Sequence, residues 1–245
     1  MAVWSLAVNP SFLLPSRERV LPDALVYIVD DDPHMNGALA DLLRSVGIAS
    51  RGFLAAQEFL QSELEDLPGC LVLDVRLRGT NGLDLQEHLR LHGIDLPIIF
   101  ITAHGDIEMS VRAMKAGAHD FLTKPFRDQV FLDAVSGAIE ADRCKRATFR
   151  CGLDLRARFS SLSDREREVM LLAASGLMNK QIAGRIGISE VTIKIHRSKA
   201  MRKMAARTFA DLVKMVHELG DAAARQEPAF AVPRATAMPA ARAAG

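Results

Sequence analysis

Cysteine is scarce in this chain of 245 residues, which has only three, at positions 70, 144 and 151. Three irregularly spaced cysteines are too few for a disulfide framework or a zinc site. Cys70 stands in an apolar run, which predicts a buried thiol in a hydrophobic core. So little use of cysteine is what we expect of a protein in the reducing cytoplasm.

Long hydrophobic runs are also missing. No apolar stretch approaches the ~18 residues that a membrane-spanning helix needs, so we expect no membrane partner. The N-terminus is mildly apolar, but it lacks a basic beginning and Pro10 interrupts it. A signal peptide is therefore not predicted.

A net charge of only +1 conceals an uneven distribution. Residues 24–126 contain 15 Asp and Glu against 8 Lys and Arg, whereas residues 156–217 contain 13 Lys and Arg against 5 Asp and Glu. Chance and ordinary solvated faces are one interpretation. The other is an acidic domain followed by a domain that binds the phosphates of nucleic acid.

Short apolar runs alternate with amphipathic stretches from residue 24 onward. Continuous runs of four to six apolar residues predict parallel strands that are buried on both faces. Five such units in ~100 residues predict an α/β fold with a doubly wound, five-stranded parallel sheet. The expected strands are 25–30, 48–53, 70–74, 97–102 and 119–123, and the expected helices are 34–46, 55–65, 82–92, 106–117 and 127–145.

The remaining segments differ in character. Residues 1–23 contain three prolines and no period, which predicts an irregular extension, and the aperiodic stretch 146–157 is expected to be a linker. Residues 158–220 predict a small all-α domain of four helices, the first of which opens with a Ser163–Glu166 capping box. The Ala-, Pro- and Arg-rich residues 221–245 are expected to be a disordered tail.

Carboxylates follow two of the predicted strands, and a lysine follows a third. Asp30 and Asp31 come after the first strand, Asp74 ends the third, and Lys124 follows the fifth. Ligands of such folds bind where strands end, and a hard cation such as Mg²⁺ suits clustered carboxylates. One carboxylate can then act as nucleophile toward a phosphoryl donor, with Lys124 and the Thr102 hydroxyl nearby. Taken alone, Asp74 could equally be a helix cap or a loop carboxylate.

These residues resemble, in order and spacing, the receiver domain of two-component response regulators. The matching pieces are Val29-Asp30-Asp31-Asp32, Leu71-Val72-Leu73-Asp74, Gly82-Leu83, Ile101-Thr102-Ala103 and Phe121-Leu122-Thr123-Lys124-Pro125-Phe126.

The resemblance covers about 24–145 and implies specific roles. Asp74 would accept a phosphoryl group from a sensor histidine kinase, and Asp30, Asp31, Asp74 and the Arg76 backbone carbonyl would hold Mg²⁺. Thr102 and Phe121 would form a switch pair, although Phe121 could be a plain core residue. Lys124-Pro125 would be a cis peptide. Arg78 stands where the family usually has proline, which predicts a looser loop.

The basic domain contains a short helix, a tight Gly187-Ile188-Ser189 turn and a longer helix at 190–204, which is helix-turn-helix spacing. Ile193, His196, Ala200 and Met204 form one apolar stripe of the longer helix, so His196 is expected to be a core histidine. The cationic outer face of this helix could be merely solvated. In a helix-turn-helix unit it would instead enter the major groove of DNA.

Residues 158–220 are similar to the LuxR-type DNA-binding domain. The matching residues include Leu162-Ser163-Asp164-Arg165-Glu166, Gly176, Asn179-Lys180-Gln181-Ile182-Ala183 and Ile188-Ser189-Glu190-Val191-Thr192-Ile193-Lys194-Ile195-His196-Arg197. The resemblance implies base contacts by Lys194, Ile195 and Ser198. It implies phosphate contacts by Lys180, Thr192, Arg197 and Lys199. Met178 stands where a capping Ser or Thr is common, so Asn179 is expected to cap the helix instead.

The two halves together look like a response regulator of the FixJ/NarL type. We expect a transcription regulator rather than an enzyme. This regulator would dimerise when phosphorylated, and its partners would be promoter DNA, a sensor histidine kinase and RNA polymerase. One alternative is a Mg²⁺-dependent phosphatase of the haloacid-dehalogenase kind, since Asp30-x-Asp32 matches its core pair. Another is a DNA-binding protein whose receiver only dimerises and takes no phosphate.

Overall fold

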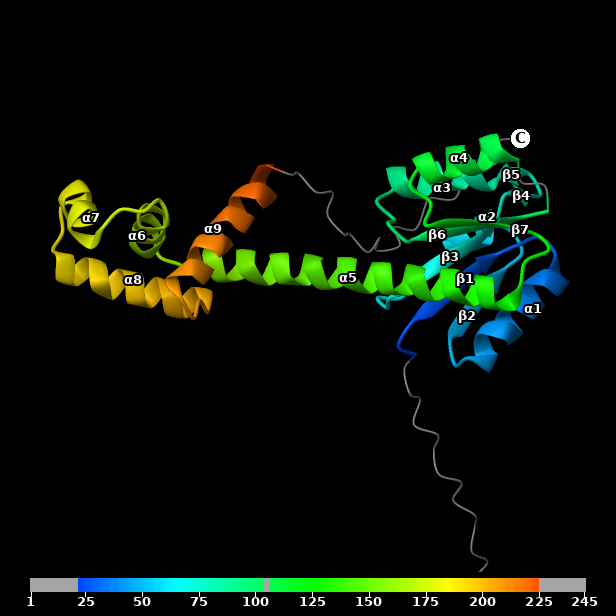
Figure 1. Ribbon diagram of the computed structural model, residues 1–245, viewed down its shortest axis with the longest axis horizontal. Helices are drawn as coiled ribbons and strands as arrows, with labels where there is room; N and C mark the ends of the chain where they lie inside the picture. The colour runs from blue at the N-terminus through cyan, green and yellow to red at the C-terminus, as the bar shows by residue number, and fades with distance from the viewer. Residues whose placement is uncertain (1–21, 104–105, 225–245) are drawn as a thin grey trace, which may run out of the picture.

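The computed structural model describes residues 22–103 and 106–224, and in it two bodies are joined by one long helix (Figure 1). The predicted N-terminal extension, apart from residues 22–23, and most of the predicted tail lie outside the described residues. No helix in the described part of the chain is both long and apolar enough to cross a membrane.

The N-terminal body is a parallel sheet with helices on both faces. Its strands are β1 (Leu25–Val29), β2 (Ala49–Phe53), β3 (Gly69–Asp74), β6 (Ile98–Thr102) and β7 (Asp120–Thr123), in the order β2-β1-β3-β6-β7. The helices are α1 (Pro33–Ser45), α2 (Ala56–Gln61), α3 (Gly82–Leu91), α4 (Ile107–Lys115) and the first part of α5 (Asp128–Ser160). The predicted fold class is therefore confirmed.

Apolar side chains fill both faces of this sheet. Val26, Ile28, Cys70 and Val72 pack under α1 and α5, while their neighbours along the same strands pack toward the other helices. Burial of such alternating sets is the main source of stability for a parallel sheet. Cys70 is fully buried as predicted, and its burial raises the pKa of the thiol.

A small hairpin departs from the predicted pattern. Strands β4 (Arg76–Leu77) and β5 (Thr80–Asn81) pair antiparallel directly after Asp74. Gly79 lies between them with a φ of 80°, a conformation that glycine adopts without strain. Because the paired segments are only two residues long, their hydrophobic pattern is too short to predict a strand.

The predicted end of a helix near residue 145, with an aperiodic linker after it, was wrong. Helix α5 runs without a break from Asp128 to Ser160 and passes through Gly152. Its first half buries Phe131, Val135 and Ala138 on the sheet, and Leu155 and Phe159 near its end pack into the C-terminal core. The apolar side chains of α5 face the sheet in its first half and the C-terminal core near its end. The sequence therefore shows no single continuous apolar stripe that would predict one long helix.

The middle of α5 is also held by charged side chains. Asp142 is fully buried, and its Oδ2 accepts hydrogen bonds from the Gly69 amide at 2.9 Å and from Arg146 Nε at 2.7 Å. Arg146 also pairs with Asp66, and Lys145 pairs with Asp95. These contacts hold α5 at the edge of the sheet opposite the strand ends that carry Asp30 and Asp74.

The C-terminal body consists of α6 (Asp164–Ala174), α7 (Asn179–Ile186), α8 (Glu190–Met204) and α9 (Phe209–Ala224). The Ser163–Glu166 capping box is present, as predicted. Helix α9 continues through Gly220 to Ala224, into the first residues of the stretch that the sequence predicted to be a disordered tail. Asn179 does not cap α7: Met178 is the N-cap residue, and its amide donates to Gln181 Oε1 at 2.8 Å.

Glu166 ties the start of α6 to the end of α8. Its side chain is only 6% exposed, and its carboxylate accepts hydrogen bonds from Lys203 Nζ at 2.6 Å and from the Ser163 amide at 2.9 Å. The hydrogen bond from Lys203, followed by that from the Ser163 backbone, lowers the pKa of Glu166 to about 2.

We expect Glu166→Gln to lower the melting temperature of the C-terminal domain by a few degrees at pH 7. A depressed pKa stabilises the fold above the unfolded-state value of about 4.3, and this contribution is lost as pH falls toward the folded-state pKa. Calorimetry of the full chain should therefore show the difference from wild type shrinking below pH ~4.

The matched control is Glu168→Gln on the same helix, whose carboxylate forms an ion pair with Arg165. It should leave the melting temperature nearly unchanged. Equal effects of the two substitutions would contradict the role assigned to Glu166.

Candidate functional site

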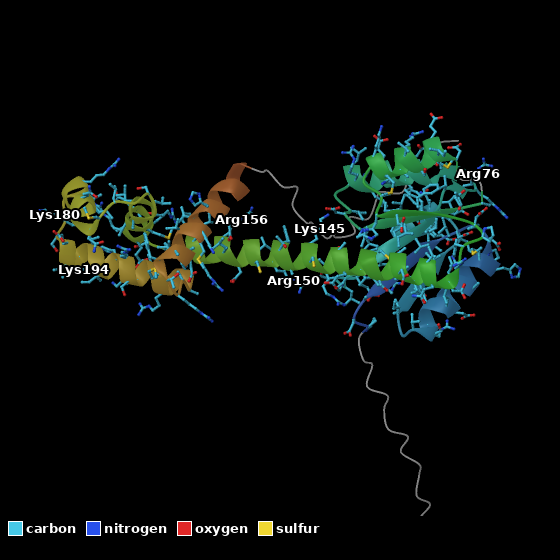
Figure 2. All side chains as sticks on the ribbon, viewed as in Figure 1. Arg76, Lys145, Arg150, Arg156, Lys180 and Lys194 are labelled. Carbon is cyan, nitrogen blue, oxygen red and sulfur yellow. The ribbon has the colours of Figure 1, made fainter. Side chains whose placement is uncertain are left out.

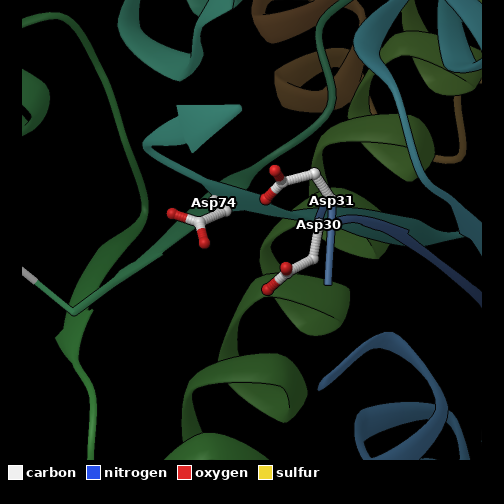
Figure 3. Close-up of side chains that lie close together, drawn as sticks. All are labelled: Asp30, Asp31 and Asp74. Atoms are coloured by element: carbon white, nitrogen blue, oxygen red, sulfur yellow. The ribbon is translucent and has the colours of Figure 1, made fainter. Parts of the chain in front are cut away.

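Three carboxylates meet at the carboxyl edge of the sheet. Asp30 follows β1 and Asp74 ends β3, and these strands are neighbours with Val29 opposite Leu73. Figure 3 shows the side chains of Asp30, Asp31 and Asp74 lying close together. A carboxylate oxygen of each lies within 4.8 Å of the others, so the cluster predicted from the sequence is present.

Burial leaves the carboxylates of this cluster with little water to screen their mutual repulsion. Asp30 is fully buried, Asp74 is 8% exposed and Asp31 is half-buried. Ionised carboxylates so close together and so poorly hydrated repel each other and need a cation. An acidic cluster of this kind at the edge of such a sheet is typical of a Mg²⁺ site.

Lys124 supplies one cation. Its Nζ donates to Asp30 Oδ2 and to Asp74 Oδ2, each at 2.8 Å. Burial by itself lowers the pKa of Lys124, but the hydrogen bonds to the two carboxylates outweigh burial, and the pKa is raised. The following Lys124–Pro125 bond is cis, as predicted.

Backbone amides hold the remaining oxygens. The Asp32 amide donates to Asp30 Oδ1 at 2.9 Å, and the Arg76 amide donates to Asp74 Oδ1 at 3.0 Å. The Asp32 carboxylate instead caps α1 by accepting from the His34 amide. It is absent from the described metal-ligand cluster, so the Asp30-x-Asp32 pair of a phosphatase core is not formed.

Arg78 is a participant that sequence reasoning did not assign. Its Nε donates to Asp31 Oδ2 at 3.0 Å, although the side chain is 87% exposed. The sequence showed only that an arginine replaces the usual proline. The Arg78–Asp31 ion pair could have been predicted from one signal: a cation four residues after Asp74, in a loop beside an acidic cluster.

Gly82 explains how α3 can begin so close to Asp74. A Cβ at this position would lie 2.5 Å from the Asp74 carbonyl oxygen, which no side chain tolerates. The Gly82 amide donates to the Val75 carbonyl at 2.8 Å, and this bond fixes the loop beside the cluster. Glycine here therefore positions the carboxylate rather than loosening the chain.

Thr102 and Phe121 lie on the neighbouring strands β6 and β7. Thr102 is 1% exposed, and its carbonyl accepts from the Lys124 amide at 2.7 Å. Phe121 is half-buried, and its ring centroid lies 6.3 Å from that of Phe100. The structure thus places Thr102 beside the strand end that carries Lys124 and packs Phe121 at the margin of the core.

The second candidate surface lies on α8. Gly187, with a φ of 72°, ends α7, and Ser189 caps α8 by accepting from the Thr192 amide at 3.2 Å. This is the predicted helix-turn-helix. Figure 2 shows Lys180 and Lys194 at the end of the molecule far from Arg76.

The predicted DNA-contacting residues differ in exposure. Lys180, Lys194, Ile195, Ser198 and Lys199 are exposed, whereas Thr192 and Arg197 are half-buried. Val191, which the sequence did not single out, is 67% exposed and lies on the same helix face as Lys194, Ile195 and Ser198. Its position in the first turn, three residues before Lys194 and four before Ile195, was the available signal.

Arg197 has an internal role. Its Nη1 donates to Asn179 Oδ1 at 3.1 Å, and its guanidinium stacks over the Phe209 ring, 4.2 Å from the centroid. It therefore links α7, α8 and α9. His196 is half-buried in the same helix, and Ile193, Ala200 and Met204 of the predicted stripe are fully buried.

Two family descriptions match this chain. Residues 26–136 match the "Response regulator receiver domain", and residues 160–216 match "Bacterial regulatory proteins, luxR family".

Whole-length relatives agree. The chain is 52% identical to Nodulation protein W of Bradyrhizobium diazoefficiens over 83% of this chain and 90% of that one. It is 40% identical to the transcriptional regulatory protein FixJ of Rhizobium meliloti over 80% of this chain and 96% of that one. The solved structure of the response regulator StyR superposes with a TM-score of 0.74 at 46% identity, over 80% of this chain and 99% of that one.

The chain covers almost the whole length of these relatives, and the receiver match precedes the luxR match along it. The matched families are signalling receivers and DNA-binding regulators, not enzymes. The chain belongs to the two-component response regulators with a receiver domain and a LuxR-type DNA-binding domain, and it is a transcriptional regulator.

Proposed function

We propose that Asp74 is the phosphoacceptor and that its phosphorylation controls how α8 binds promoter DNA. The observation that carries this proposal is the contact of Lys124 with both Asp30 and Asp74 inside a nearly buried acidic cluster. An Asp74 oxygen would attack the phosphorus of a phosphohistidine on a sensor kinase, and the P–N bond would break as the histidine leaves.

Mg²⁺ would be held by Asp30, Asp31, Asp74 and the Arg76 backbone carbonyl. The three carboxylates offer hard oxygen ligands close enough to share one small ion. When bound, Mg²⁺ would offset negative charge on the incoming phosphoryl group. Lys124, freed from part of its pairing with Asp74, would contact a phosphoryl oxygen as a point charge.

The switch would pass through Thr102 and Phe121 to α4. The Thr102 hydroxyl would turn toward the phosphoryl group, and the half-buried Phe121 ring would move inward. Ile107, Val111 and Met114 form an exposed apolar stripe on α4, with 84%, 44% and 46% exposure. An unpaired stripe of this kind suits contact with a second phosphorylated chain.

The DNA contacts would be made by the exposed face of α8. Lys194, Ile195 and Ser198 would read base edges, with Lys180, Thr192 and Lys199 on phosphates. Arg197 would reach a phosphate only through the part of its guanidinium that Asn179 and Phe209 leave open. A dimer would present two such helices to two half-sites, beside RNA polymerase in the cytoplasm.

Phosphorylation should raise the affinity for operator DNA. We expect a small phosphodonor with Mg²⁺ to strengthen binding of the wild type by at least about tenfold in gel shifts, and to leave Asp74→Ala unchanged. Sedimentation of the same samples should show dimers only for the phosphorylated wild type. Asp133→Ala, which removes an exposed carboxylate of α5, is the control and should respond like the wild type. Equal binding in all samples would favour a receiver that takes no phosphate.

Arg78 should compete with the metal for Asp31. We therefore expect Arg78→Ala to tighten Mg²⁺ binding in calorimetric titration. Because an exposed ion pair contributes little free energy, the gain in affinity should not exceed about fivefold. The matched control is Arg90→Ala, which removes an exposed arginine from α3 and should leave the affinity for Mg²⁺ unchanged. Weaker Mg²⁺ binding by Arg78→Ala would contradict this interpretation of the pair.

Lys194→Ala should weaken binding to an operator fragment by about tenfold and flatten its dependence on salt. Lys214→Ala removes an equally exposed lysine from α9 and is the control. If both variants lost affinity equally, general charge rather than contact by α8 would explain the binding.

A further inference from the structure

A cavity of about 460 Å³ lies between α3 and α4, which are neighbours in Figure 1. The residues that line it are Leu83, Gln86, Glu87 and Arg90 of α3, and Arg112, Lys115, Ala116 and Gly117 at the end of α4. Helices of such a sheet begin at the edge that carries the acidic cluster, so their ends lie toward the opposite edge. The lining residues include none of Asp30, Asp31, Asp74 and Lys124.

The inner wall of the cavity contains an unpaired acceptor. Gln86 is 5% exposed, and its Nε2 donates to the Ala116 carbonyl at 3.2 Å. Its Oε1 is buried and has no hydrogen-bond partner among the residues that the structure describes. Buried polar atoms are rarely left without a partner, so this oxygen suits a donor group from a bound molecule.

The rim is cationic. Arg90, Arg112 and Lys115 are exposed, as is Glu87, and none of the four forms an ion pair within the described part of the chain. Three cations against one carboxylate leave an excess of positive charge at the mouth of the cavity. Such a rim attracts an anionic group, and arginine can bind a phosphate or carboxylate through two hydrogen bonds.

We propose that this cavity binds a small, hydroxyl-bearing anion of the size of a sugar phosphate or a sugar acid. A rotation of the Gln86 amide turns the buried Oε1 toward the cavity, where it accepts a hydrogen bond from a ligand hydroxyl. The anionic group lies against Arg112 and Lys115. The volume is within the range of cavities that hold small ligands. Because the ligand contacts both helices, its binding opposes a shift of α4 relative to α3.

The test is calorimetric titration of the full chain with ribose 5-phosphate and with gluconate. We expect at least one of them to bind with a Kd on the order of 1 mM or tighter, and neutral ribose not to bind. Binding of ribose 5-phosphate alone identifies a phosphorylated ligand class, and binding of gluconate alone identifies a sugar acid. Asp74→Ala should bind as the wild type does.

Two variants locate the site. The double substitution Arg112→Ala and Lys115→Ala removes only exposed side chains and should weaken binding at least about tenfold. Gln86→Leu should also weaken it, whereas Arg150→Ala, an exposed arginine of α5, should not. Failure of both anions to bind overturns the proposal, as does binding that the double variant leaves intact. If Gln86→Leu does not fold, the double variant decides alone.

Discussion

The contact of the Lys124 ammonium group with Asp30 and Asp74 is the interaction on which the receiver domain depends. It places a cation between two nearly buried carboxylates that would otherwise repel each other. It joins the ends of β1, β3 and β7, three strands that are distant in sequence. A phosphoryl group or a metal ion at this edge would change the balance of charge around Lys124.

Helix α5 connects the receiver domain to the DNA-binding domain. The buried Asp142 and its partner Arg146 fix the helix to the far edge of the sheet, and Leu155 and Phe159 fix its end in the C-terminal core. One continuous helix therefore sets the direction in which the second domain leaves the first (Figure 1). Pairing of two receivers through α4 would in this way also set the separation of the two α8 helices.

The sequence predicted the sheet and the acidic cluster because their signals are local. Apolar runs that end in Asp30, Asp74 and Lys124 place those side chains at one edge once parallel strands are assumed. It did not predict the continuity of α5, because the apolar face of that helix changes partner along its length. The Arg78–Asp31 and Arg197–Phe209 contacts were missed because they join segments whose approach depends on tertiary packing. The roles of Thr102, Phe121 and the Arg76 carbonyl stay predictions.

The central claim is that Asp74 takes up a phosphoryl group. Peptide mapping by mass spectrometry, after the full chain is incubated with a small phosphodonor and Mg²⁺, tests it most directly. The account predicts one added HPO₃ unit on the peptide that contains Asp74, and its loss when hydroxylamine cleaves the acyl phosphate. An unmodified chain, or a phosphoryl group on another residue, would contradict it.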